Sequence, residues 1–347
     1  MSDRPVRRVS RFASQQVWAI TESKLDAIVE VLRMRAAGIV LSKEEIQARI
    51  GASTRAISGR SGAVGVLPLC GVISPKVNTM TEISGGTSLD VWMTAFREMR
   101  DDPGVTAIVL DVDSPGGSVF GVQEAADEIY KSRSVKPITA FVDYMCGSAA
   151  LWLACSAGRI ISTPSGEVGS LGVFCMHECW EKANEMIGMK PTYISAGQYK
   201  VEGNQDAPLS DDALAYIQSQ VDAVYATFLK SVAKGRGVTV KVAEANFGQG
   251  RMLLASDALA AGLIDGIDTM DGVIRSAAKP GKMRAETETP AIEVTLELDG
   301  KAVAAAAVST LPDAVDPKGR AALDAQQQAE HEADQEVALL AAILGRE

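Results

Sequence analysis

Apolar residues recur along this chain at two spacings, which predicts strands alternating with helices. Continuously apolar, β-branched runs are typical of strands buried on both faces, and helical periodicity marks the segments between them. The predicted strands cover residues 63–73, 105–112, 137–142, 159–163, 166–174 and 190–195, and the predicted helices cover residues 88–100, 119–131, 149–158, 178–187 and 209–234. Ser210 is expected to cap the last of these helices and Gly235 to follow its end. This alternation predicts an α/β architecture in which ligands bind beyond the strand ends.

Two further helices are expected before this body. Residues 21–37 carry apolar side chains at helical spacing, and residues 42–45 (Ser-Lys-Glu-Glu) fit a capping box in front of a short second helix. Residues 51–62 are rich in Gly, Ser and Ala, which predicts a linker. We therefore expect residues 1–62 to form a helical extension that packs on the body or on a neighbouring subunit and carries no chemistry.

Length and charge narrow the class of protein. A chain of 347 residues with 47% hydrophobic residues can bury one large core with appendages. The net charge of −10 lies mostly in residues 285–347, which hold 13 acidic and 4 basic residues, so the body is nearly neutral. Phosphate binding needs clustered Lys and Arg, so this distribution argues against nucleic acid as the partner.

Cysteine spacing and hydropathy indicate the cellular compartment in which the protein is expected. The five cysteines form no CxxC pair, which indicates free thiols in a reducing compartment. No apolar segment follows the basic N-terminal residues, so we expect no signal peptide. The longest nearly apolar run, residues 149–157, is far shorter than the roughly 20 residues that span a bilayer. We therefore expect no membrane association.

A candidate nucleophile follows the strand predicted at residues 137–142. Residues 147–150 (Gly-Ser-Ala-Ala) form a small-residue turn before a helix, and such a turn places the Ser148 hydroxyl beside backbone N–H groups that stabilise negative charge. The alternative is tight packing where helix meets sheet. Residues 113–118 (Asp-Ser-Pro-Gly-Gly-Ser) also have two interpretations, a tight turn or an oxyanion hole, because glycine lets backbone N–H groups approach a reacting carbonyl.

A serine nucleophile needs a general base, and the residues alone leave two candidates. His331 lies in the acidic tail, so His177 is the histidine that could complete a triad. Lys200 follows a predicted strand, and a lysine serves as base when its pKa is lowered toward neutrality. Cys175, His177 and Cys179 alternate as metal ligands can, but three ligands without a fourth make a weak zinc site.

Four motifs together resemble one peptidase family. Residues 113–117 (Asp-Ser-Pro-Gly-Gly), 147–150, 168–173 (Val-Gly-Ser-Leu-Gly-Val) and 197–200 (Gly-Gln-Tyr-Lys), in this order, are similar to the signal peptide peptidase A family of the ClpP/crotonase superfamily. The resemblance covers roughly residues 63–274. It implies a spiral of β-β-α units without a cofactor or metal, and a homo-oligomer. It also implies a Ser-Lys dyad of Ser148 and Lys200, with Gly116 and Ala149 as oxyanion donors, Ser170 orienting Lys200, and Gly117 shaping the loop.

Within that family the chain resembles phage and prophage capsid assembly proteases of the lambda type, on residues 18–21, 199–203 and 232–237. We therefore expect a peptidase domain at residues 63–279 that cuts scaffold, capsid or portal proteins in the host cytoplasm or inside the prohead. Residues 280–347 are expected to be a largely disordered acidic tail ending in a scaffold-like helix at 321–344. The alternatives are a soluble housekeeping peptidase that degrades signal-peptide remnants and a catalytically silent assembly protein.

Overall fold

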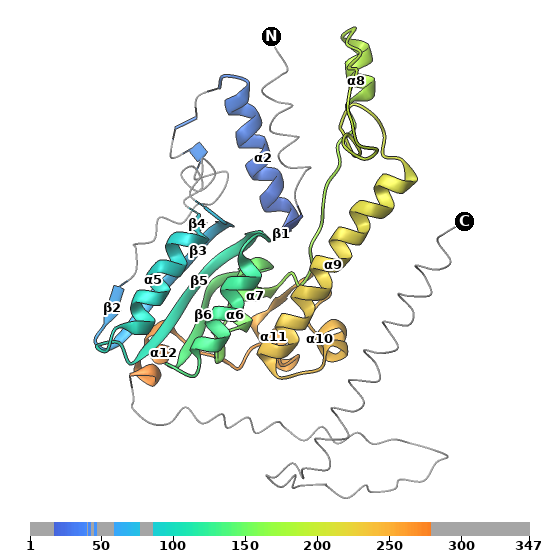
Figure 1. The fold of residues 1–347 in the computed structure, drawn as a ribbon. Coiled ribbons are helices and arrows are strands. Elements are labelled where there is room, and N and C mark those ends of the chain that lie inside the picture. The colour runs from blue at the N-terminus through green and yellow to red at the C-terminus, as the bar shows by residue number, and fades with distance from the viewer. Residues whose placement is uncertain (1–16, 40, 43–44, 47–58, 77–85, 279–347) are drawn as a thin grey trace, which may run out of the picture. The chain divides into compact units, whose positions relative to one another are not determined.

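A computed structural model of the chain describes residues 17–39, 41–42, 45–46, 59–76 and 86–278 (Figure 1). The chain divides into two units, Met1–Arg284 and Ala285–Glu347, and all of the described residues belong to the first. The predicted tail, its helix at 321–344 and most of the predicted linker lie outside the described residues.

One sheet of ten strands organises the described residues, which confirms the mixed α/β fold. Its main path runs β10-β7-β6-β5-β3-β2, and all neighbours on it are parallel except β2 with β3. These strands are β2 (Gly59–Ser61), β3 (Val64–Ser74), β5 (Ala107–Ser118), β6 (Ile138–Gly147), β7 (Arg159–Ser162) and β10 (Gly266–Ile267). Four short strands attach beside this path: β1 (Trp18–Ile20), β4 (Thr87–Ser88), β8 (Glu167–Gly169) and β9 (Met252–Leu254).

Helices bury both faces of this sheet. The larger core joins it to α5 (Leu89–Asp101), α6 (Val122–Ser132), α7 (Ala149–Cys155) and α9 (Asp211–Arg236), and a smaller core joins its other face to α12 (Met270–Ala277). Along β5, Ile108 and Leu110 enter the larger core while Val109 enters the smaller one, because successive side chains of a strand point to opposite faces. The continuous apolar run of β5 is therefore explained by burial on both sides.

The remaining helices are α2 (Glu22–Ala36), α8 (Glu181–Met186), α10 (Val240–Asn246) and α11 (Ala255–Ala260). The predicted capping box is confirmed, because the Ser42 N–H donates to Glu45 Oε2 at 2.8 Å and the Glu45 N–H donates to Ser42 Oγ at 3.1 Å. The Ser210 cap is confirmed too, since its Oγ accepts the Ala213 N–H at 3.2 Å. None of the helices described is both long and apolar enough to cross a bilayer.

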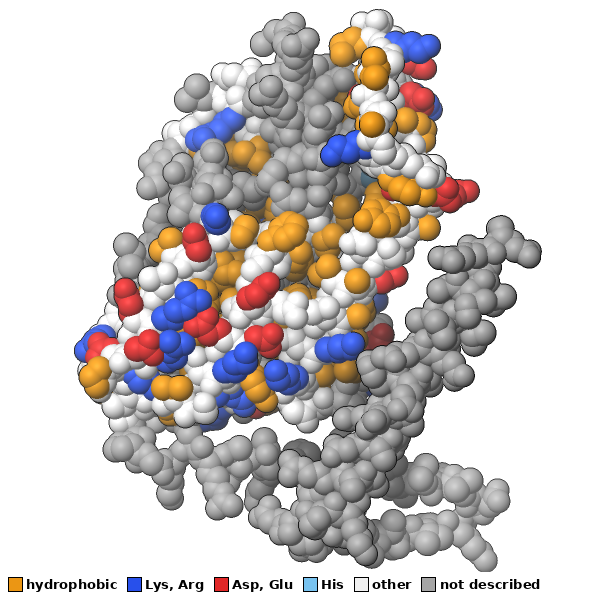
Figure 2. Space-filling model, in the orientation of Figure 1, with side chains coloured by type: hydrophobic (Ala, Val, Ile, Leu, Met, Phe, Trp, Pro, Cys, Tyr) orange, Lys and Arg blue, Asp and Glu red, His pale blue; other side chains and the backbone are white. Residues whose placement is uncertain are grey.

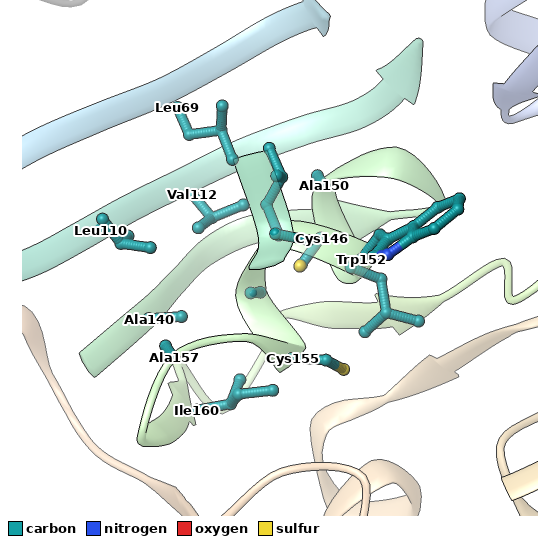
Figure 3. Close-up of a cluster of buried hydrophobic side chains, with 14 of the residues drawn as sticks. Leu69, Leu110, Val112, Ala140, Cys146, Ala150, Trp152, Cys155, Ala157 and Ile160 are labelled. Atoms are coloured by element: carbon teal, nitrogen blue, oxygen red, sulfur yellow. The ribbon is translucent and has the colours of Figure 1, made fainter. Parts of the chain in front are cut away.

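Helix α7 lies at the centre of the larger core, with all seven residues buried (Figure 3). The Trp152 ring stacks on Phe228 of α9, with 4.5 Å between the ring centroids. Burial raises the pKa of the Cys155 thiol to about 12. The prediction that Gly235 follows the end of α9 is wrong: the helix continues to Arg236, and a Cβ on Gly235 would lie 2.0 Å from the Cys155 carbonyl oxygen. Glycine is therefore required where α9 crosses α7.

Three strand predictions differ from the structure. The strand predicted at 190–195 is wrong, because no strand pairs with this segment and residues 188–210 form neither helix nor strand. The strand predicted at 105–112 continues through the glycine motif to Ser118, where β3 pairs with one edge and β1 with the other. The strand predicted at 166–174 is reduced to β8, and Phe174 makes only an isolated bridge.

A buried ion pair holds the end of α9 against the sheet. Arg236 Nη1 and Nη2 donate to Asp265 Oδ2 and Oδ1 at 2.9 and 2.7 Å, and the same Oδ2 accepts the Ile160 N–H at 2.7 Å. The Arg236 side chain is 7% exposed. Asp265→Ala should lower the free energy of unfolding by about 3–5 kcal/mol, because it leaves a buried guanidinium without its partner.

Urea unfolding measures this loss, and Asp127→Ala provides the control. Asp127 pairs with Lys234 at 3.5 Å on the surface, with side chains 43% and 53% exposed. Its removal should change the free energy of unfolding by less than about 1 kcal/mol. Equal losses in the two variants would contradict a stabilising role for the buried pair.

Candidate active site

Ser148 lies at the junction between β6 and α7 and is fully buried. Its backbone has φ 53° and ψ −112°, a conformation that non-glycine residues seldom adopt. Its N–H donates to the Gly169 carbonyl at 2.9 Å, and its hydroxyl donates to the Gly172 carbonyl at 3.1 Å. Its own carbonyl accepts the Trp152 N–H at 2.9 Å and so begins α7. The fold thus fixes the serine in a strained turn at a helix N-terminus.

Backbone strain gathers around this serine. Among the described residues, the non-glycine residues with positive φ are Ser148, Ser170 and Gln249. Ser170 follows β8, whose Gly169 pairs with Gly147, and the Ser170 N–H donates to the Arg251 carbonyl at 2.8 Å. Strained backbone costs free energy and is concentrated at functional sites. Ser170 therefore lies beside Ser148, since the neighbouring Gly169 carbonyl accepts the Ser148 N–H.

The glycine motif of β5 lies against the same turn. Gly116 has φ +100°, and a Cβ built on it would lie 3.0 Å from the Ala149 nitrogen and 2.9 Å from the Gly147 carbonyl oxygen. A Cβ on Gly117 would lie 1.9 Å from the Ile73 carbonyl oxygen, so this glycine lets β3 and β5 pair. The two predicted oxyanion donors, Gly116 and Ala149, are thus neighbours across 33 residues of sequence.

The Gly116 and Ala149 N–H groups differ in whether they already donate a hydrogen bond. The Gly116 N–H donates to Ser114 Oγ at 3.2 Å, whereas the Ala149 N–H has no hydrogen-bond acceptor in the part of the chain that the structure describes. Ser114 Oγ in turn donates to the Gly71 carbonyl at 2.6 Å. One donor is therefore free, and the other is held by a long bond to a buried hydroxyl.

Neither candidate base is hydrogen-bonded to Ser148 within the chain. Lys200 is exposed and lies between α8 and α9, in a turn where its N–H donates to the Gly197 carbonyl at 3.1 Å. His177 is half-buried, and its Nε2 is 3.1 Å from the Asn204 carbonyl oxygen. The structure thus brings together Ser148, Gly116, Ala149 and Ser170 and leaves Lys200 apart from them.

Residues 130–284 match the model of Peptidase family S49. This part of the chain is therefore similar to a peptidase S49 domain. Ser148, Ser170 and Lys200 all lie inside the matched range, and Gly116 precedes it.

Two curated relatives of this chain come from phages. Capsid assembly protease C of Escherichia phage lambda is 29% identical over 269 residues, which are 75% of this chain and 60% of that protein. Head-tail preconnector protein GP5 of Enterobacteria phage P21 is 29% identical over 235 residues, which are 66% of this chain and 46% of that protein. The resemblance indicated by the four motifs is confirmed, although the chain spans less than two thirds of either relative.

A solved structure also aligns with part of this chain. A membrane-bound stomatin-specific protease, 1510-N, covers 62% of this chain and 84% of its own, with 16% sequence identity and a TM-score of 0.36.

The alternating Cys175, His177 and Cys179 do not converge on a metal site among the described residues. Among the described residues, no group of three or more His, Cys, Asp or Glu side chains is arranged to hold a metal ion. Cys179 is exposed, Cys175 is half-buried, and His177 contacts Asn204 instead.

Sequence reasoning missed one part of the site. Residues 1–62 were expected to carry no chemistry, and β1 of this segment pairs with Gly116–Ser118, directly beside the turn that holds Ser148. Lys24, two residues into α2, is near enough to Asp113 of the glycine motif for their charges to interact. Burial lowers the pKa of the Lys24 amine, and the Asp113 carboxylate opposes this shift. Only the apolar run at residues 17–20 hinted at this strand, and it is too short to predict one.

Proposed function

We propose that this protein is a serine endopeptidase in which Ser148 is the nucleophile and Lys200 is the general base. The observation that carries the proposal is the placement of Ser148 at the N-terminus of a fully buried helix, in a strained backbone, beside the Gly116 and Ala149 backbones. Backbone N–H groups fixed in this way stabilise the oxyanion of acyl transfer, and removal of one such donor costs about 10²–10³ in kcat.

The chemistry follows from these positions. A neutral Lys200 amine accepts the Ser148 hydroxyl proton as Oγ attacks the peptide carbonyl carbon. The Ala149 and Gly116 N–H groups bind the oxyanion, and Gly116 exchanges its long bond to Ser114 for this one. Collapse of the tetrahedral intermediate breaks the C–N bond, and the Lys200 ammonium protonates the departing amine. Water, deprotonated by Lys200, then hydrolyses the acyl-enzyme.

The base is best supplied by a second copy of the chain. Ser148 is buried and Lys200 is exposed, on the segment between α8 and α9 that lies away from α7 in Figure 1. Apolar side chains gather on this segment and on the start of α9 (Figure 2). Met186, Ile194, Tyr199 and Tyr216 are 88%, 97%, 62% and 58% exposed, and monomeric proteins seldom expose so many together. We propose that this surface meets a neighbouring subunit, with Ser170 of that site orienting the incoming amine.

The substrates that fit best are capsid, scaffold or portal proteins of a phage head. This proposal rests on the two phage relatives, whose names refer to capsid assembly and to a head-tail preconnector. It places the protein in the host cytoplasm or inside the prohead, with residues 63–279 as the protease and residues 280–347 as a scaffold-like tail. A housekeeping peptidase for signal-peptide remnants is the second candidate, because a relative whose name includes signal peptide peptidase SppA also matches.

Co-expression with the coat, scaffold and portal proteins tests this function. The wild-type chain should produce defined fragments of at least one of them, identified by mass spectrometry, and Ser148→Ala should produce none. Fragments of signal peptides alone would favour the housekeeping role. Normal head assembly with no fragments in either case would favour the catalytically silent assembly protein.

A further inference from the structure

Strand β1 is paired along both of its edges. On one edge it runs antiparallel to the end of β5, with Trp18 opposite Ser118, Ala19 opposite Gly117 and Ile20 opposite Gly116. On the other edge the Trp18 N–H donates to the Phe174 carbonyl at 2.8 Å, and the Phe174 N–H donates to the Trp18 carbonyl at 3.0 Å. Three residues of the N-terminal segment thus fill the gap between two backbone stretches that would otherwise present unpaired N–H and C=O groups.

These two stretches are the borders of the Ser148 site. A Cβ on Gly116 would lie 2.2 Å from the Ala19 carbonyl oxygen and 3.0 Å from the Ala149 nitrogen, so β1 and the Ala149 amide approach the same side of Gly116. The acceptor of the Ser148 hydroxyl, Gly172, is two residues before Phe174. After Ile20 the chain continues along the same line, because the Thr21 N–H donates to the Pro115 carbonyl at 3.3 Å. A peptide bound for cleavage would need this space.

Side chains anchor β1 through a small separate core. Trp18 and Ile20 are 2% and 3% exposed and pack in one cluster with four residues of α2 and with Val72 of β3. Phe174 and Met176 pack against the same cluster. Ala19 points the other way, into the larger core, and is fully buried. The strand therefore presents two large apolar side chains on one face and a small one on the other.

Charges hold the helix that follows β1. Arg33 of α2 donates to Glu178, which lies four residues beyond Phe174. Lys24 of α2 is attracted by Asp113, at the start of the glycine motif. An ion pair thus links α2 to the border near Phe174, and a charge attraction links it to the glycine motif.

We infer that β1 is a substrate-like strand, supplied by the chain itself, that occupies the peptide cleft and must leave before another polypeptide binds. The inference builds on the proposed function, since Ser148 is the group that the cleft serves. It also names the substrate class: an extended polypeptide that pairs antiparallel with residues 116–118. Such a peptide carries large apolar side chains at the positions of Trp18 and Ile20 and a small residue between them.

The first test is the rate at which a fluorophosphonate probe labels Ser148 in the full-length chain. Trp18→Ala removes the main anchor of β1 and should speed labelling at least about ten-fold over wild type. Trp92→Ala is the matched control, because Trp92 is a tryptophan 5% exposed in α5, away from β1. It should leave the rate near the wild-type value. Equal labelling of wild type and Trp18→Ala would overturn the inference.

A second test does not depend on catalysis. A fluorescent peptide with the sequence of residues 17–22 (Val-Trp-Ala-Ile-Thr-Glu) is titrated into Ser148→Ala with and without Trp18→Ala. Saturable binding only to the chain that also carries Trp18→Ala is expected, and the same peptide with Trp replaced by Ala should not bind. Binding to both chains equally, or to neither, would overturn the inference. If the peptide binds only the chain with Trp18→Ala but the probe labels no variant, β1 does occupy a peptide-binding cleft. In that case the proposed peptidase activity is wrong.

Two milder variants test the inference even if Trp18→Ala fails to fold. Ile20→Ala trims the second anchor, and Ile161→Ala, in the core beneath α12, trims an isoleucine of similar burial. Ile20→Ala should label about three-fold faster than Ile161→Ala. Identical rates for these two variants would count against β1 as the occupant of the cleft.

Discussion

Replacing Ser148 with alanine should lower the turnover of a cleaved peptide by at least about 10⁴-fold while leaving the fold intact. The change removes Oγ, the only nucleophilic atom of this side chain and so the only one that can form the acyl-enzyme. Alanine keeps the Cβ and loses one hydrogen bond, from the hydroxyl to the Gly172 carbonyl. Loss of this single buried hydrogen bond should lower the free energy of unfolding by only about 1 kcal/mol.

Ser156→Ala is the matched control for that prediction. Ser156 lies at the other end of α7, is almost fully buried, and donates its hydroxyl to the Trp152 carbonyl at 3.2 Å. The control loses a similar buried hydrogen bond without touching the nucleophile, so its kcat should stay within about two-fold of wild type. A Ser148→Ala chain as active as Ser156→Ala would remove Ser148 from the mechanism.

Lys200→Ala is expected to have the second largest effect, a loss of about 10³-fold in kcat, because general base catalysis contributes 10²–10⁴. Lys190→Ala is its control, an exposed lysine on the same segment. His177→Ala should retain activity, since the His177 ring contacts the Asn204 carbonyl. The reverse pattern, with His177 required and Lys200 dispensable, would replace the dyad by a triad.

Mixing the two inactive chains tests where the base comes from. In an oligomer assembled from equal amounts of Ser148→Ala and Lys200→Ala, about a quarter of the sites between neighbours pair an intact Ser148 with an intact Lys200. Activity should therefore recover to about a quarter of the wild-type level when the chains are unfolded and reassembled together. A mixture that stays inactive would mean that serine and lysine meet within one chain.

Much of the body was predictable because its strands are buried on both faces. The run at 105–112 does not alternate between apolar and polar residues, because Val109 and Leu110 on its two faces enter different cores. The turn at Gly147 and Ser148 was also predictable, because small residues between a strand and a helix have few other uses. The order of motifs pointed to Gly116 and Ser170 as neighbours of Ser148, and the structure places both at the turn.

Other features depend on contacts that sequence pattern does not encode. Strand β1 exists because Ser118 and Phe174, far away along the chain, offer it two edges. Residues 190–195 have strand-like composition and no edge to join, so they remain irregular. Gly235 lies inside α9 because Cys155 comes close to it. Helix and strand propensities describe the preference of a single residue. The structures of β1, residues 190–195 and Gly235 depend instead on contacts with residues far away in the sequence.

The most direct measurement of the central claim is peptide mapping by mass spectrometry after fluorophosphonate treatment carried to completion. The account predicts one adduct per chain, on the peptide that contains Ser148, formed by wild type and by His177→Ala but not by Lys200→Ala. An adduct on another residue, or an adduct on Ser148 that needs His177 and survives the loss of Lys200, would contradict it.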